Sequence, residues 1–343
     1  MYDARPVLGA LVAAALVWFP VRVAAQDVEE LFRKVNPSVV VIKAKGRDVS
    51  PTRGLVTFSE IGSGVLISPD GKVMTAAHVA HAMDEIMVEF LGTERVPARV
   101  VASEPAADLA MLQLAHVPAG AQVARLGDSD GVRVGQQVLV IGAPYGLAHS
   151  FSAGWISAKW LPNTAYREMP LAEFFQTTAT INTGNSGGPM FNMAGEVVGV
   201  VSHIISKGGG SEGLGFVVTM KSARYFLMER KWTWVGMEGV VLTGELAEIF
   251  NVPGGSGLLV KVVPKDSPAW QMGLQGGDRT ATIAGRDIVV RGDVVLAMAG
   301  ITIKTEADLP RIREKLGAMP TGQSFTASVL RAGQVIELTG TVP

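Results

Sequence analysis

The sequence contains no cysteine and no marked excess of charge of either sign. Without cysteine, disulfide-stapled scaffolds, thiolate metal sites and cysteine nucleophiles are all excluded. Lys and Arg total 30 against 31 for Asp and Glu, and no long run of one sign occurs, which argues against a nucleic-acid binder. The same balance argues against a protein held to membrane surfaces by a polybasic segment. We therefore expect no nucleic-acid partner.

The first residues have the pattern of an export signal. Arg5 precedes an unbroken apolar run over residues 7–19, and Val23-Ala24-Ala25 supplies small residues at its end. A signal peptide needs about 7–15 apolar residues, whereas a membrane-spanning helix needs about 20. We predict that residues 1–25 are a signal peptide cleaved after Ala25; the alternative is an uncleaved, tilted anchor. In both readings the rest of the chain is translocated.

The remaining length is enough for two domains, because the chain has 343 residues, of which 48% are apolar. Short apolar stretches separated by Gly, Pro, Asn and Asp predict a first, all-β domain, a barrel or sandwich, over residues 26–232. Its strands are expected at 39–43, 64–67, 96–102, 110–114, 138–141, 197–201 and 214–218. Helices are expected at 27–35 and 220–231, and loops at 53–61 and 164–175.

A second unit, residues 233–343, has a different pattern. Its strands alternate with two short helices and end in a hairpin that turns at Ala332-Gly333, which predicts an α+β fold. A hairpin inserted over residues 279–291 separates two Gly-Asp steps. The expected strands are 258–263, 293–298, 325–330 and 335–338, and the expected helices are 267–272 and 306–316.

Residues 183–189 read Thr-Gly-Asn-Ser-Gly-Gly-Pro, which places Ser186 among glycines. Glycines allow a sharp bend that projects the hydroxyl, and they allow backbone N–H groups to converge on a developing oxyanion. The alternative is a glycine-rich surface turn. The stretch also fits G-x-S-x-G of the α/β-hydrolases, but Pro189 opposes the helix that must follow, and the acid and histidine required downstream are missing.

Two partners for the serine lie upstream of it. His78 stands in Thr-Ala-Ala-His-Val, and Asp108 stands in an apolar stretch, Ala-Asp-Leu-Ala-Met-Leu. A sheltered carboxylate can hold a histidine in one tautomer and stabilise its cation, although each residue alone also fits an ordinary structural role. The chain order His78, Asp108, Ser186 is that of the chymotrypsin-type triad. His116, His149 and His203 are given no role.

With these motifs the sequence resembles the trypsin-like serine proteases, and within them the bacterial HtrA/Deg branch. TAAHV (75–79), AADLAMLQL (106–114) and TGNSGGP (183–189) carry the resemblance, and the second unit is similar to a PDZ domain. The resemblance implies a mostly β fold, with a chymotrypsin-like double β-barrel followed by a PDZ-like α+β domain. It also implies a periplasmic protein, active in protein quality control on unfolded or misfolded proteins, and a homotrimer.

The resemblance also assigns roles to residues. Ser186 would be the nucleophile, His78 the general base and then acid, and Asp108 the group that orients His78. The backbone N–H groups of Gly184 and Ser186 would form the oxyanion hole. The rival interpretation is a catalytically silent chaperone or peptide-binding scaffold on the same fold. His78 and His81 form an H-x-x-H pair, but no third ligand lies nearby, so we expect no metal and no cofactor.

Candidates for the substrate pocket are Thr180, Ile181, Val201 and Phe216. Trypsin-like enzymes that select basic residues carry an acid six positions before the nucleophile, where this sequence has Thr180. We therefore expect small or medium aliphatic side chains at the P1 position of substrates; the alternative is that the apolar candidates belong to the barrel core.

The PDZ-like unit is expected to bind peptides with apolar C-termini. Such domains add the peptide as a strand and hold its terminal carboxylate with backbone N–H groups. The carboxylate loop would be Trp234, Val235, Gly236 and Met237. The helix at 306–316 would line the groove, where Leu309 and Ile312 are either groove or core residues.

Overall fold

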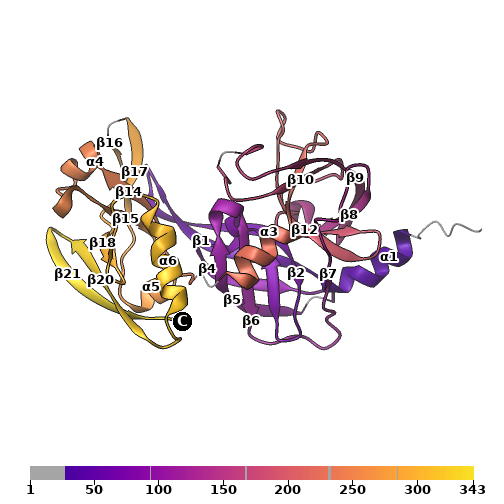
Figure 1. Cartoon of the computed structure of the whole chain (residues 1–343), viewed down its shortest axis with the longest axis horizontal. Coiled ribbons are helices and arrows are strands. Elements are labelled where there is room, and N and C mark those ends of the chain that lie inside the picture. The colour runs from indigo at the N-terminus through magenta and orange to yellow at the C-terminus, as the bar shows by residue number, and fades with distance from the viewer. Residues whose placement is uncertain (1–27, 93, 167, 231–232, 284) are drawn as a thin grey trace, which may run out of the picture.

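The computed structural model describes residues 28–92, 94–166, 168–230, 233–283 and 285–343, so the predicted signal peptide lies outside the described residues. Two β-barrels lie together at one end of the molecule, and a smaller α+β unit lies at the other (Figure 1). No helix in these ranges is long and apolar enough to cross a membrane. The barrels contain the predicted triad.

The first barrel is a closed ring of six antiparallel strands in the order β1-β2-β3-β6-β5-β4. Its long first hairpin pairs without interruption from Val39↔Val65 to Ser50↔Gly54. The predicted loop at 53–61 is therefore wrong, because residues 54–61 belong to β2 and only Arg53 lies in the turn. Leu55, Phe58 and Ile61 are exposed there, so the segment lacks the buried run that identifies a strand in sequence. The strands are β1 (Val39–Ser50), β2 (Gly54–Leu66), β3 (Lys72–Thr75), β4 (Met83–Glu89), β5 (Arg95–Glu104) and β6 (Leu109–Leu114).

The second barrel is also a six-stranded ring, closed by the pairing of β11 with β12, and β7 adds to β12 in parallel. Two six-stranded barrels confirm the expected fold class. The strands are β7 (Arg125–Leu126), β8 (Gln137–Gly142), β9 (Ser150–Trp160), β10 (Phe174–Thr177), β11 (Pro189–Asn192), β12 (Glu196–Ile204) and β13 (Gly215–Thr219).

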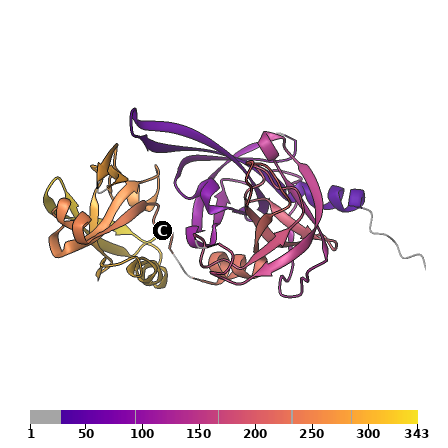
Figure 2. The same cartoon turned by 90° about the horizontal axis from the view of Figure 1, so that it is seen from above.

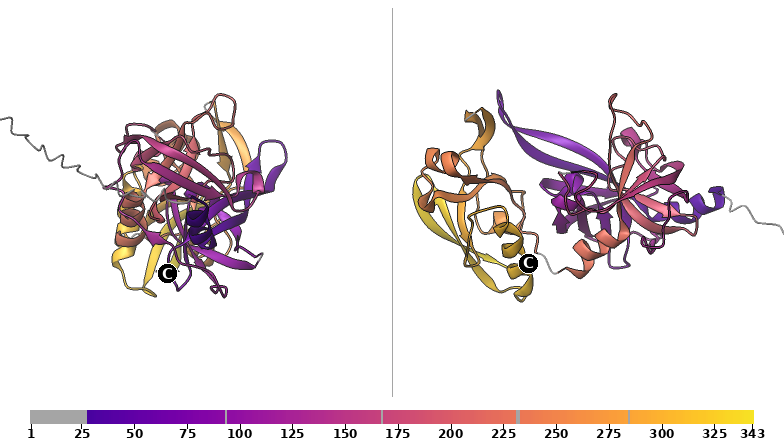
Figure 3. Two further views of the ribbon diagram at one scale, coloured as in Figure 1. Left: turned by 90° about the vertical axis from the view of Figure 1, so that its right-hand side faces the viewer. Right: turned by 45° about the horizontal axis from the view of Figure 1, so that its top comes forward.

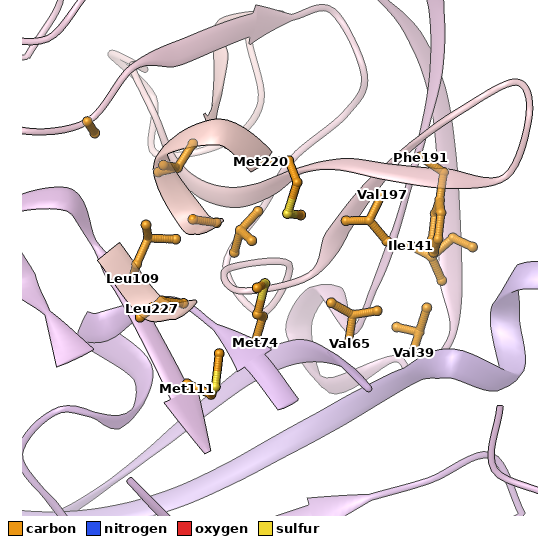
Figure 4. Packing of buried hydrophobic residues seen from close by; sticks show 14 of the residues in the cluster. Val39, Val65, Met74, Leu109, Met111, Ile141, Phe191, Val197, Met220 and Leu227 are labelled. Carbon is orange, nitrogen blue, oxygen red and sulfur yellow. The ribbon is translucent and has the colours of Figure 1, made fainter. Parts of the chain in front are cut away.

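A large apolar cluster joins the two barrels. Val65, Met74 and Leu109 contribute from the first barrel, and Ile141 and Phe191 contribute from the second (Figure 4). All five side chains are essentially inaccessible to solvent. Since buried side chains of this size each stabilise the fold by about 1.5–3 kcal/mol, the cluster fixes one barrel against the other. The residues of the predicted triad, which come from both barrels, therefore share one rigid frame.

Short helices cover the barrels, and the predicted helices at 27–35 and 220–231 are confirmed over the described residues. The second of these widens into a π-helical segment, η4. The helices are α1 (Val28–Val35), α2 (Ala77–Ala80) and α3 (Met220–Arg224), with η1 (Asn36–Ser38), η2 (Pro105–Ala107), η3 (Pro144–Gly146) and η4 (Tyr225–Glu229).

The C-terminal unit packs a mixed set of helices against a sheet of order β14-β15-β18-β20-β21, with β19 paired to β18. The terminal hairpin turns at Ala332-Gly333, as predicted, and the inserted hairpin forms a separate two-stranded sheet. The strands are β14 (Glu238–Thr243), β15 (Ser256–Val262), β16 (Arg279–Ile283), β17 (Arg286–Val290), β18 (Val294–Met298), β19 (Ile301–Thr302), β20 (Ser324–Arg331) and β21 (Gln334–Thr341), and the helices are α4 (Gly244–Ile249), η5 (Pro253–Gly255), α5 (Pro268–Gln271) and α6 (Asp308–Ala318).

The β1–β2 hairpin extends from the first barrel toward the C-terminal unit (Figure 2). Near its tip, the carbonyl of Val49 accepts a hydrogen bond from Thr280 Oγ1 of β16, at 3.2 Å. Closer to the barrel, Arg47 donates to the carbonyl of Val263 at 3.0 Å and to the carboxylate of Asp84 at 2.6 and 2.9 Å. The oblique view in Figure 3 shows the same approach of the hairpin to the C-terminal unit.

Candidate active site

The structure brings His78 and Asp108 together at the end of the first barrel. His78 lies in the one-turn helix α2, and its Nδ1 is 2.9 Å from Oδ1 and 3.1 Å from Oδ2 of Asp108. The backbone N–H of His78 also donates to Oδ1, at 3.1 Å. Because the carboxylate only accepts hydrogen bonds, Nδ1 carries the proton, and Nε2 of a neutral His78 is left as a base.

Asp108 is held by the turn that precedes it. Its side chain is 2% exposed, and the residue adopts a left-handed conformation with φ 52° at the end of η2. Glu104 caps the start of this turn by accepting from the N–H of Ala106 at 3.1 Å. Ser202 lies in a bulge of β12, and its Oγ donates to Oδ2 of Asp108 at 2.5 Å. The sequence analysis missed Ser202, since a serine after an apolar strand forms no motif.

The pKa of His78 is higher than that of free histidine. Burial lowers the pKa of His78, but the hydrogen bond and negative charge of Asp108, together with the charge of Glu60, raise it further, and the net effect is an upward shift. The ring remains accessible, with 44% of the side chain exposed, while its carboxylate partner is buried. A base that stays reachable and has a stabilised cation fits proton transfer to and from a substrate.

Ser186 lies on a loop whose backbone requires glycine at positions 184 and 187. At Gly184 (φ 101°) a Cβ would come within 2.1 Å of the carbonyl oxygen of Ala143, and at Gly187 (φ 82°) within 2.1 Å of Thr75 Oγ1. The loop therefore packs closely on both barrels. The hydroxyl of Ser186 donates to the carbonyl of Ser202 at 3.2 Å, so its single proton does not point to His78 in this state.

The peptide before Gly184 has a defined orientation. The N–H of Tyr145 donates to the carbonyl of Thr183 at 2.8 Å, and the N–H of Asn185 donates to the carbonyl of Asn182 at 3.0 Å. In a trans peptide the C=O and N–H bonds point in opposite directions, so the N–H of Gly184 points away from Tyr145. Within the described residues, no acceptor is assigned to the N–H groups of Gly184 and Ser186.

The four residues predicted for the substrate pocket do not share one cavity. Ile181, Val201 and Phe216 are each at most 3% exposed and belong to the barrel cores, the alternative that the sequence analysis left open. Thr180 is exposed and lines a cavity of about 300 Å³ with Asn182. Among the residues that the structure describes, no carboxylate lines that cavity.

His203, a residue without a predicted role, contacts the Ser202 hydroxyl that donates to Asp108. Its Nδ1 is 3.1 Å from Ser202 Oγ. Its ring stacks on Phe216 at 5.0 Å between centroids and contacts Tyr166 at 4.3 Å and Phe174 at 5.4 Å.

The predicted carboxylate loop lies at the junction of the two units. Gly236 (φ 77°) packs against Ser267, whose hydroxyl donates to the Gly236 carbonyl at 3.1 Å, and Trp234 packs on the core of the first barrel. The loop leads into β14, which is an edge strand in the described part of the sheet. A cavity of about 170 Å³ is lined by all four loop residues, by Leu309, Ile312 and Arg313 of α6, and by His81, Ser103 and Pro105 of the first barrel.

His81 has Ser103 as a hydrogen-bond partner. Its Nδ1 is 2.8 Å from Ser103 Oγ, and burial lowers the pKa of His81 to about 4, with the charge of Arg313 adding to the shift. No cluster of three or more His, Asp or Glu side chains suited to a metal ion occurs in the part of the chain that the structure describes.

The chain is similar to known proteins over most of its length. Residues 62–200 match the family described as "Trypsin-like peptidase domain". A "Probable periplasmic serine endoprotease DegP-like" of Ectopseudomonas mendocina (strain ymp) is 37% identical over 285 residues, which are 78% of this chain and 59% of that protein. One of the same description from Halomonas elongata is 35% identical over 292 residues, 82% of this chain and 56% of that protein. The chain thus spans less than two thirds of these curated relatives.

Solved structures are similar to this chain over most of its length. The "HtrA-type protease AlgW with tripeptide" is 30% identical with a TM-score of 0.52, and the match covers 91% of this chain and 95% of that one. The "HtrA-type protease AlgW with decapeptide" is 27% identical with a TM-score of 0.52, covering 91% and 97%.

Proposed function

This chain belongs to the HtrA-type family of trypsin-like serine proteases, and on that premise we propose that it is a periplasmic serine endopeptidase. Its substrates are unfolded or misfolded protein segments. Residues 26–232 are the protease domain and residues 233–343 a PDZ-like domain that binds C-terminal peptides. Residues 1–25 direct export.

The proposed mechanism is acyl transfer. His78 Nε2 takes the proton of the Ser186 hydroxyl as Oγ attacks the scissile carbonyl carbon, and the N–H groups of Gly184 and Ser186 bind the oxyanion. His78 then gives the proton to the leaving amine, and the C–N bond breaks. Water, deprotonated by His78, hydrolyses the acyl-enzyme and releases Ser186. Asp108 keeps Nδ1 protonated and stabilises the imidazolium.

One observation carries this proposal: a buried carboxylate, Asp108, meets both the ring and the backbone of His78, and a serine hydroxyl, Ser202, holds it from the other side. Such an arrangement serves a base that gains and loses a proton. Ser186 needs only a rotation about χ1 to leave the Ser202 carbonyl. Catalytic hydrogen bonds are often loose without substrate and tighten when it binds.

The proposed specificity is for small or medium aliphatic P1 side chains. No acid stands at Thr180, and the cavity beside it holds no carboxylate, so nothing there would neutralise Lys or Arg. Aliphatic residues are buried in folded proteins, which restricts cleavage to exposed or unfolded segments. A peptide panel with arginine preferred at P1 would contradict this specificity.

The peptide groove of the PDZ-like domain lies between β14 and α6. Its support is the edge position of β14, to which an extended peptide can add as a strand, and the apolar side chains of Leu309 and Leu258 in the cavity beside it. We further propose that the protein forms a homotrimer, the basic assembly of the family. Exposed Leu147 and Phe151, the latter in contact with Phe32, offer apolar surface for that contact.

The test of the proposed function is labelling by a fluorophosphonate together with casein digestion. The full-length chain should be labelled at Ser186 and should cleave unfolded casein, and a Ser186→Ala variant with an unchanged circular dichroism spectrum should do neither. A chain that binds unfolded casein and suppresses its aggregation, without labelling or cleavage, would instead be the silent chaperone.

A further inference from the structure

We propose that His203 is a positioning residue for catalysis. Through its Nδ1–H it holds Ser202 Oγ in the orientation from which the hydroxyl donates to Asp108, and so it sets how strongly Asp108 holds the imidazole of His78. This inference rests on the proposed function. It extends the catalytic set by a residue from the second barrel that does not itself touch substrate.

The direction of the hydrogen bonds follows from proton counting. Asp108 Oδ2 is 2.5 Å from Ser202 Oγ, and a carboxylate only accepts, so the single hydroxyl proton of Ser202 points to Asp108. His203 Nδ1, 3.1 Å from the same oxygen, must then be the donor. The chain of hydrogen bonds therefore runs from His203 to Ser202, from Ser202 to Asp108, and meets there the bond from His78.

The surroundings of His203 favour the tautomer with the proton on Nδ1. Nε2 is buried, and no partner for it is found among the described residues. In the opposite tautomer, an N–H donor would be buried unpaired and the lone pairs of Nδ1 and Oγ would face each other, which costs more than an unpaired acceptor. Contacts with Phe216, Tyr166 and Phe174 fix the plane of the ring.

His203 stays neutral over the pH range in which His78 titrates. Burial lowers the pKa of His203 to about 4; the charge of Asp108 opposes the shift, a charged His78 adds to it, and Glu168 opposes it. Tyr166, whose hydroxyl donates to Glu168 at 3.2 Å, has a raised pKa, because burial and that carboxylate disfavour its anion. The ring of His203 therefore acts as a neutral donor throughout.

Without the donor, the Ser202 hydroxyl is less polarised, so its hydrogen bond to Asp108 weakens relative to that with an alternative, weaker acceptor. Met169 Sδ lies 3.6 Å from Ser202 Oγ. A hydroxyl that turns toward this sulfur leaves Oδ2 of Asp108 with one hydrogen bond fewer. The carboxylate then holds the His78 cation more tightly, so the pKa of His78 rises and less of the base is neutral at a given pH.

Two variants separate the donor from the ring. His203→Phe keeps an aromatic ring against Phe216 and Tyr166 and removes the donor; His203→Asn removes the ring but offers an amide N–H in place of Nδ1–H. In the full-length chain we expect His203→Phe to lower kcat about fivefold, the worth of one neutral hydrogen bond, at unchanged KM. In a plot of kcat against pH, the acidic limb of the His203→Phe variant should move to higher pH. His203→Asn should keep the parent position of that limb.

A parent-like kcat and acid limb in His203→Phe would overturn the proposal, as would equal losses in both variants without a shift of the limb. ¹⁵N-histidine spectra of the full-length Ser186→Ala chain give an answer independent of activity: His203 should be protonated at Nδ1 and bare at Nε2, and the reverse tautomer would overturn the proposal. An unlabelled, inactive parent with the expected tautomer would refute the proposed function while leaving the hydrogen-bond chain intact.

Discussion

Arg313 on α6 donates a hydrogen bond to Glu104 of the first barrel, with Nη1 3.1 Å from Oε2. The Glu104 side chain is only 4% exposed, and its other oxygen caps η2, the turn that ends at Asp108. One carboxylate thus connects the helix beside the proposed peptide groove to the residue that holds His78. A change at α6 therefore has a short covalent and hydrogen-bonded route to the His78–Asp108 pair.

Replacing Arg313 with Gln should lower both the free energy of unfolding and the rate of casein cleavage. The change leaves a buried carboxylate at Glu104 without its countercharge, and because Arg313 is 28% exposed we expect a loss of about 1–3 kcal/mol in the free energy of unfolding, measured with urea. We also expect kcat on casein to fall, since η2 is less well held.

Arg311→Gln is the matched control on the same helix. Arg311 is 67% exposed and pairs with Asp308, so the control should cost at most about 0.5 kcal/mol. Equal effects of the two variants would contradict the role given to Arg313.

The pH dependence of kcat/KM should report the His78–Asp108 pair. Catalysis requires neutral His78, and the pKa of His78 is raised above its usual 6.5, so activity should rise with pH through a midpoint above that value. Asp108→Asn should move the midpoint downward and lower kcat by about 10⁴-fold, because the carboxylate no longer stabilises the cation. The same raised pKa means that the pair stabilises the fold fully below the unfolded pKa of histidine and loses this contribution as pH rises through the folded pKa. A midpoint that Asp108→Asn leaves unchanged would separate the limb from His78.

Gly184→Ala should abolish most activity. The new Cβ would lie 2.1 Å from the Ala143 carbonyl oxygen, so the peptide that carries the proposed oxyanion donor must move. We expect kcat to fall about 10²–10³-fold, the usual cost of one lost donor. Gly209→Ala is the control: it has a similar positive φ of 80°, but nothing lies within 4 Å of its added Cβ. The control should lose about 1 kcal/mol or less of stability and keep parent activity. Parent-like kinetics in Gly184→Ala would remove the loop from the mechanism.

Peptides with a free apolar C-terminus should bind the full-length Ser186→Ala chain more tightly than their amidated forms. Loss of the charge-assisted hydrogen bonds to the carboxylate should weaken binding about tenfold, as measured by calorimetry. Gly236→Ala should weaken binding too, because its Cβ would lie 2.3 Å from the Cβ of Ser267. Gly273→Ala, with a positive φ and open space around its Cβ, serves as the control in the same unit. Equal affinity for free and amidated peptides would exclude the carboxylate loop.

Much of this arrangement could be predicted from local signals. The motifs around His78, Asp108 and Ser186 indicate the triad because each chemistry needs a particular neighbour: glycines beside the serine and apolar residues around the acid. The turn at Ala332-Gly333 is also predictable, because a glycine between two apolar strands supplies the positive φ of a tight hairpin; the positive φ of Ala332 has no such signal in the sequence.

What the sequence could not reveal depends on contacts between distant segments. Ser202 contacts Asp108, and His203 contacts Ser202, at the bulge where β12 pairs with β13, and no residue pattern marks that bulge. Residues 54–61 form a strand because the backbone of β1 pairs with them, although most of their side chains are exposed or half-buried. Ile181 and Phe216 look like pocket residues in sequence, and only the packing of the second barrel shows them to be core.

The hydrogen bond between Thr280 and Val49 joins the β1–β2 hairpin to β16 of the C-terminal unit. It adds to the hydrogen bonds of Arg47 with Val263 and of Arg313 with Glu104, so the two units are held at several separate points, which restricts rotation of one unit against the other. The proposed peptide groove consequently keeps a fixed orientation relative to His78. Shortening the β1–β2 hairpin or the β16–β17 hairpin would remove this hydrogen bond and allow the two units to move more freely. A distance distribution measured between spin labels on the two units would then broaden.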